Sequence, residues 1–169
     1  MTIEEIANSK DTQTKALFAL SAAELVLDHL KPEDVTYRLA HEAVALAWKW
    51  MYGEKVLGDD LAIYLEDPDY EKDLGIRESD CEHDQGMLSA LVVITIAIGF
   101  IARFAYEFEN NNKRPAAVWE TTDAFFAEIM KFIVDVPGFE SHALDQIRSQ
   151  MNENRQKSAN LSFHRFTQA

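Results

Sequence analysis

The residues best suited to chemistry are carboxylates that lie close together in the sequence. Between residues 59 and 84, the acidic segment, the chain has 11 acidic residues and only two basic ones, Lys72 and Arg77. Such a segment can bind a hard cation, attract a basic partner or serve as a solvated linker. The spacing from Asp67 to Glu78 is similar to that of a calcium loop, but Lys72 occupies the position where that loop requires glycine. The acidic segment therefore favours a docking surface or a linker over a calcium site.

Histidine and aspartate residues occur in the order used by all-α metal-dependent phosphohydrolases, which is a His, then a His-Asp pair and then a distant Asp. The candidates are His41, His83, Asp84 and either Asp123 or Asp135. A chain with five His and 13 Asp residues among 169 contains such an order readily by chance. We therefore predict no catalytic residue, no metal site and no cofactor, and keep this enzyme as an alternative.

The composition disfavours further classes of function. The net charge of −13 argues against nucleic acid as a ligand, because binding phosphates requires a basic face. The single cysteine, Cys81, cannot form an internal disulfide, and its acidic neighbours raise the pKa of a thiol, which disfavours a nucleophile. The first ten residues lack the apolar core of a signal peptide. We therefore expect a cytoplasmic protein.

Helices must position these residues, because apolar residues recur at steps of three and four and never alternate over a sustained stretch. Glycine and proline divide the chain at helix-sized intervals. We expect one all-α domain of five or six helices over residues 1–154, followed by a polar, loosely ordered tail over residues 155–169. The expected helical stretches are 16–30, 39–50, 59–65, 86–108, 118–136 and 144–151, with Asp34, Pro115 and Ser141 near helix starts.

The stretch 86–108 is expected to form the central helix. Residues 86–102 carry no charge, but they fall short of the about 20 residues that a membrane span needs. A helix that is apolar on every side is otherwise surrounded by its neighbours in a core. We therefore expect a buried helix around which the others pack, and no membrane contact.

Two stretches resemble a known family. The first has Trp48 and Trp50, which lie on different sides of a helix, followed by residues 58–65. The second comprises residues 104–109, Pro115, Trp119-Glu120 and residues 123–126. Together they resemble all-α immunity proteins of bacterial polymorphic and contact-dependent toxin systems. The resemblance implies a helical protein that protects the producing cell by binding a toxin domain encoded beside it.

The acidic segment and the resemblance lead to one hypothesis. Many such toxins are nucleases, whose clefts must be basic to hold phosphates, so an acidic protein can cover the cleft. We expect carboxylates to steer a toxin domain with a basic surface and two tyrosines to anchor it. A helical adaptor without a toxin partner is the other binding alternative, and the oligomeric state stays open. The predicted partner-binding residues are Asp59, Asp60, Tyr64, Glu66, Asp67, Asp69, Tyr70, Glu71 and Asp73.

Overall fold

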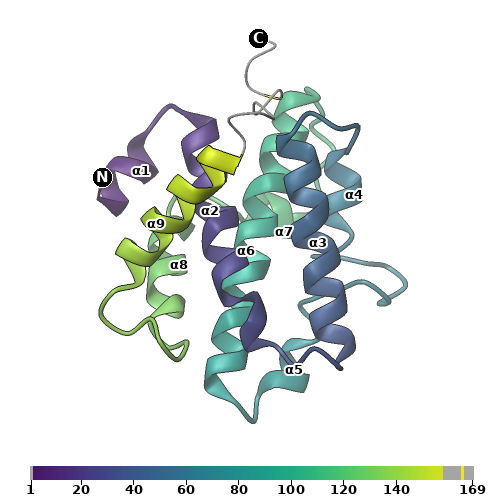
Figure 1. The fold of residues 1–169 in the computed structure, drawn as a ribbon. Helices are drawn as coiled ribbons and strands as arrows, with labels where there is room; N and C mark the ends of the chain where they lie inside the picture. Colours follow the sequence, from purple (N-terminus) through teal and green to yellow (C-terminus); the bar gives the residue numbers. More distant parts are fainter. Residues whose placement is uncertain (1, 158–164, 166–169) are drawn as a thin grey trace.

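The computed structural model describes residues 2–157 and residue 165, and this part of the chain consists of helices and loops without a β-strand. The prediction of an all-α fold is therefore confirmed (Figure 1). The long helices are α2 (Thr12–Val26), α3 (Val35–Met51), α6 (Gln85–Phe108), α8 (Phe125–Ile133) and α9 (Ala143–Lys157). The shorter ones are α1 (Ile3–Asn8), the 3₁₀ helix η1 (Leu27–His29), α4 (Gly58–Ala62), α5 (Glu78–Cys81) and α7 (Ala116–Trp119).

Helix α6 lies at the centre of the molecule, with α3 and α4 on one side and α8 and α9 on the other (Figure 1). Helices α2, α3, α4 and α8 all contact it. Leu91, Val93 and Ile94 are completely buried although they point to different sides of the helix. Among the described residues α6 alone is long and apolar enough to cross a membrane, with a mean hydropathy of 2.2, yet 72% of its most apolar stretch is buried. The prediction of a buried central helix is confirmed.

The prediction of one continuous helix over residues 118–136 is wrong, because α7 ends at Trp119 and α8 begins at Phe125. Polar contacts with other helices hold the intervening residues. The Thr121 carbonyl accepts a hydrogen bond from Arg103 at 3.0 Å, and Asp123 binds Lys15 at 2.8 Å. Gly99 permits the close approach, since a Cβ there would lie 2.5 Å from Thr121 Oγ1. These tertiary contacts override the helical spacing of the apolar residues.

Helix starts agree only partly with the prediction. Asp34 precedes α3 as expected, but its side chain makes no capping hydrogen bond. Ser141 does not begin α9, which starts at Ala143. Asp84 caps α6, since its carboxylate accepts a hydrogen bond from the Met87 N–H at 3.0 Å. The short helices α1 and α5 were not predicted, and α1 begins with a capping box formed by Thr2 and its third helical residue.

The C-terminal region is described in part. Helix α9 continues to Lys157, so the predicted boundary after residue 154 falls inside it, and the predicted tail over 158–164 and 166–169 lies outside the described residues. Arg165 donates a hydrogen bond to the Trp50 carbonyl at 2.9 Å.

Trp50 is buried and Trp48 is only partly buried, which confirms that the two rings point to different sides of α3.

Candidate functional site

The acidic segment begins at α4, which lies directly against α6. Gly58 makes this contact possible, because a Cβ there would lie 2.7 Å from the Tyr106 ring. The Gly58 N–H also donates a hydrogen bond to Glu109 at 2.6 Å. The Tyr106 hydroxyl donates to the Asp59 carboxylate. Burial and the adjacent Asp59 carboxylate raise the pKa of Tyr106, so this hydroxyl stays protonated and holds Asp59 at the exposed end of α4.

The loop between α4 and α5 is folded by its own carboxylates. Asp67 is only 5% exposed and accepts hydrogen bonds from the N–H groups of Lys72 and Asp69 at 2.8 and 3.0 Å. These hydrogen bonds keep the pKa of Asp67 below its usual value. Asp73 accepts the Gly75 N–H at 2.8 Å. Asp67, predicted as a contact residue, therefore folds the loop, and its oxygens are bound to backbone N–H groups rather than arranged around a cation.

Two more of the predicted acids also accept hydrogen bonds from backbone N–H groups. Asp60 accepts a hydrogen bond from the Leu57 N–H at 2.8 Å, and Glu66 accepts one from the Ala117 N–H at 3.3 Å. Both side chains nevertheless belong to exposed residues. Their charges therefore remain available to a partner, although their positions are set by the fold.

The two predicted tyrosine anchors differ in exposure. Tyr64 is 5% exposed, so it cannot contact a partner in this conformation, and that prediction is wrong. The ammonium of Lys72 lies 5.4 Å from the centre of its ring. Tyr70 is 66% exposed and has a φ of 60°, a left-handed conformation that residues other than glycine seldom adopt. Of the two, only Tyr70 has its ring at the surface.

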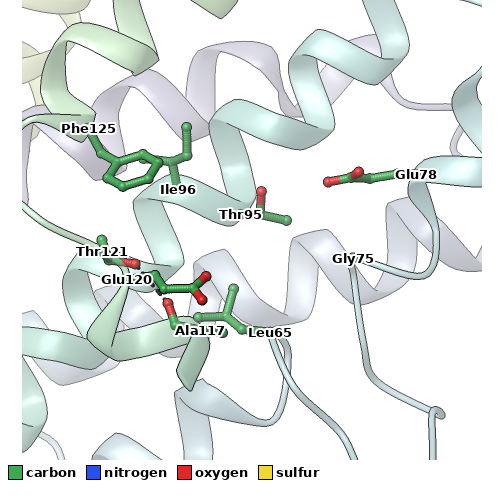
Figure 2. Close-up of a pocket in the computed structure, with 9 residues that line it drawn as sticks. All are labelled: Leu65, Gly75, Glu78, Thr95, Ile96, Ala117, Glu120, Thr121 and Phe125. Carbon is green, nitrogen blue, oxygen red and sulfur yellow. Dashed lines mark hydrogen bonds between the residues drawn. The ribbon is translucent and has the colours of Figure 1, made fainter. Parts of the chain in front are cut away.

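The structure also contains a cleft of about 330 Å³ that the sequence did not predict. On one side of it lie α5 and the loop between α4 and α5, which we call the acidic loop. On the other side lie α7 and the start of α8, with α6 behind the cleft (Figure 2). We call it the α5–α7 cleft. No local motif could reveal it, because its residues come from distant parts of the chain. The lining residues are Leu65, Gly75, Glu78, Thr95, Ile96, Ala117, Glu120, Thr121 and Phe125.

A second, larger cleft of about 590 Å³ lies between α4 and the segment that precedes α7. Its lining combines the carboxylates of Asp59 and Glu66 with the cationic Lys113 and Arg114. The Arg114 guanidinium also lies 4.5 Å from the centre of the exposed Trp119 ring. This cleft therefore has mixed charge, unlike the α5–α7 cleft, whose charged lining residues are both acidic.

The residues of the alternative enzyme do not share a site. Asp123 is engaged by Lys15 and Arg103, at 2.8 and 2.5 Å. Asp84 caps α6, while His41 packs against the Tyr37 ring on α3. In the described ranges no group of three or more His, Cys, Asp or Glu side chains is placed to hold a metal ion. The geometry therefore gives the phosphohydrolase interpretation no support.

Cys81 is a free thiol in the core. Burial raises its pKa, and the neighbouring charge of Asp80 raises it further. A thiol with a raised pKa is a poor nucleophile. The expectation about the direction of this shift is therefore confirmed.

Comparison with protein-family models matches residues 14–136 to the family described as Immunity protein Imm6. Neither the comparison with curated proteins nor the one with solved structures returned a match. The matched range extends from α2 through α8 and includes the acidic segment and the α5–α7 cleft. It confirms the resemblance to immunity proteins and implies a toxin partner and a role in binding rather than catalysis. The chain belongs to the Imm6 family of immunity proteins.

Proposed function

We propose that this immunity protein binds the toxin domain encoded beside it through the acidic segment, and that the toxin is a nuclease. The observation that supports this most directly is the exposed acidic loop around Tyr70, where Asp69 and Glu71 flank an exposed ring. Carboxylates around an aromatic side chain suit a basic surface that must be attracted and then held. Within residues 2–157 and 165, the carboxylates of Asp69 and Glu71 form no hydrogen bond and no ion pair. Both residues are exposed, so both charges face solvent.

The charge of the chain supports a nuclease as the target. A nuclease binds phosphates with a basic cleft, and a protein with a net charge of −13 is attracted to that cleft before contact. Bound there, the immunity protein excludes nucleic acid. The encounter takes place in the cytoplasm of the producing cell in this proposal, where the nucleic acids to be protected are.

Growth rescue tests the function itself. The toxin domain from the neighbouring gene is expressed with and without this protein, and the complex is purified from the rescued cells. We expect rescue, a stable complex and loss of nucleic-acid cleavage by the purified toxin. No rescue and no complex would reject the immunity role against that toxin. Rescue of cells from a toxin that cleaves no nucleic acid would reject only the proposal that the toxin is a nuclease.

Charge reversal tests the surface. Asp69→Lys/Glu71→Lys changes two carboxylates that hold no described residue in place, so the fold should be preserved. The matched control is Glu33→Lys/Glu153→Lys, which changes the net charge equally at exposed positions outside the acidic segment. At low salt we expect the association rate constant to fall about tenfold or more in the first variant, with a weaker salt dependence, and much less in the control. Equal rate constants for the two variants would place the interface elsewhere.

A further inference from the structure

We propose that the α5–α7 cleft receives an arginine side chain of the toxin. The inference rests on the proposed function and adds to it a specific anchoring site, formed by residues other than Asp69, Tyr70 and Glu71. It follows from three features of the cleft, which are its size, its apolar lining and its two facing carboxylates.

The size and lining of the cleft suit a single long side chain. Its volume of about 330 Å³ is at the lower end of the about 300–1,000 Å³ typical of small-molecule sites. Apolar surface is supplied by Leu65 of the loop after α4, Ile96 of α6 and Phe125 of α8. Such a lining can pack against the methylene groups of a long basic side chain while the charged end reaches the carboxylates.

The two carboxylates define the charge that the cleft accepts. Glu78 at the start of α5 and Glu120 at the end of α7 point into the space from opposite sides (Figure 2). Within the part of the chain that the structure describes, neither carboxylate accepts a hydrogen bond or forms an ion pair. Partial desolvation and the nearby charge of Asp73 raise the pKa of Glu78. A cation bound in the cleft would act in the opposite direction and favour the ionised carboxylate.

The arrangement favours arginine over lysine. Thr95 lies between the two carboxylates in Figure 2, and its hydroxyl already donates to the Val92 carbonyl at 2.9 Å, so the oxygen is left to accept. With the two carboxylates, Thr95 gives the cleft three acceptor groups, and a guanidinium offers five donors in a planar fork. The Phe125 ring on the same cleft offers a surface on which that plane can stack. A lysine ammonium is more strongly hydrated and has only three donors.

The test uses the purified complex with the toxin domain and measures both rate constants. Glu78→Gln/Glu120→Gln removes the two charges and keeps the side-chain shape, and Glu33→Gln/Glu153→Gln is the control with the same change in net charge. Glu78 and Glu120 are exposed in the free protein, and in the proposed complex the toxin covers them and desolvates their ion pair with the arginine. Because the cleft variant loses this ion pair, we expect its dissociation rate constant to rise about tenfold to a hundredfold, with the association rate constant close to that of the control. A second variant, Thr95→Leu, fills the cleft without changing charge and should also speed dissociation.

The outcomes separate the two proposals. If the wild-type protein binds the toxin and both cleft variants dissociate at the wild-type rate, the cleft inference is overturned while the immunity function stands. If the wild-type protein does not bind, the proposed function fails first. Thermal unfolding of each variant shows whether it is folded. If Thr95→Leu does not fold, Glu78→Gln/Glu120→Gln alone decides the test.

The arginine itself is identified by a double-mutant cycle. Each toxin arginine is replaced by alanine and paired with the wild-type protein and with Glu78→Gln/Glu120→Gln. Replacing one of these arginines should weaken binding to the wild-type protein about tenfold or more, and the same replacement should weaken binding to the cleft variant very little. If no arginine shows this coupling, the occupant is not arginine and the inference is wrong.

Discussion

Asp123, in the turn before α8, contacts cations of two other helices, and its replacement by asparagine provides a quantitative test of the packing around the cleft. Its carboxylate lies 2.8 Å from Lys15 Nζ of α2 and 2.5 Å from Arg103 Nη2 of α6. The side chains of Lys15 and Arg103 are only 11% and 14% exposed, whereas that of Asp123 is 44% exposed. Asp123→Asn therefore leaves two largely buried cations without their shared anion.

The size of the effect follows from this intermediate exposure. Breaking a buried ion pair costs about 3–5 kcal/mol, and an exposed pair contributes about 0–1 kcal/mol. Arg103 keeps its hydrogen bond to the Thr121 carbonyl and a 3.7 Å contact with Glu107, while solvent screens the Asp123 side of the network. We therefore expect the free energy of unfolding to fall by about 1–3 kcal/mol at pH 7. For a chain of this length a loss of 2 kcal/mol lowers Tm by about 4–8 °C.

The effect should depend on pH in a defined direction. Partial burial raises the pKa of Asp123, but the hydrogen bonds and charges of Lys15 and Arg103 outweigh it, so the pKa of the folded protein lies below the usual value. A carboxyl group whose pKa is lowered by folding stabilises the protein at a pH above its unfolded pKa of about 3.9. This contribution is lost as the pH falls through the folded pKa. The difference between wild type and Asp123→Asn should therefore shrink below about pH 4.

Urea unfolding of both proteins at pH 7 and pH 3, followed by circular dichroism, measures this difference. Asp145→Asn is the control, because Asp145 pairs with Arg148 at 3.3 Å and its side chain is 77% exposed. The control should change the free energy of unfolding by less than about 0.5 kcal/mol. A loss below that value for Asp123→Asn at pH 7, or an equal loss at both pH values, would refute the assignment of a stabilising anion to Asp123.

Three further predictions concern the core. Gly99→Ala should lower the free energy of unfolding by about 1–3 kcal/mol, because its methyl group would overlap Thr121. In urea unfolding, the double variant Gly99→Ala/Thr121→Ala should lose less free energy than the two single variants lose in sum. Trp50→Ala should cost about 3–5 kcal/mol in the same assay, clearly more than Trp48→Ala, because only the first ring is fully buried. The Cys81 thiol should react with a thiol reagent far more slowly in the folded protein than in urea, because it is buried and its pKa is raised.

The long helices were predictable because each repeats its apolar residues at helical spacing over several turns. The break between α7 and α8 was not, because it depends on partners far away in the sequence. The apolar positions of 118–136 continue in helical register, whereas at the break Thr121 and Asp123 form hydrogen bonds with Lys15 of α2 and Arg103 of α6. Local spacing carries no record of those contacts, so a single-sequence argument extends the helix through them.

The candidate site was predictable in its charge and not in its geometry. A count of carboxylates locates the acidic segment, but it cannot distinguish Asp67, which is bound by backbone N–H groups, from Asp69 and Glu71, which face solvent. Tyr64 and Tyr70 are likewise equivalent in the sequence, and only the folded loop buries one ring and exposes the other. Burial therefore reduces the predicted contact set to fewer residues that a partner can reach.

The carboxylates of the acidic segment have two different roles, which explains how a highly charged loop can also be ordered. Carboxylates that repel one another would loosen a loop, yet Asp67 and Asp73 each offset that repulsion by accepting backbone hydrogen bonds within it. The loop is thus held in one conformation by some of its acids while others remain at the surface. A preordered charged surface loses less conformational entropy on binding than a flexible tail of the same charge. The same loop also provides Leu65 and Gly75 to the α5–α7 cleft, so the hydrogen bonds that order the loop also help to set the shape of that cleft.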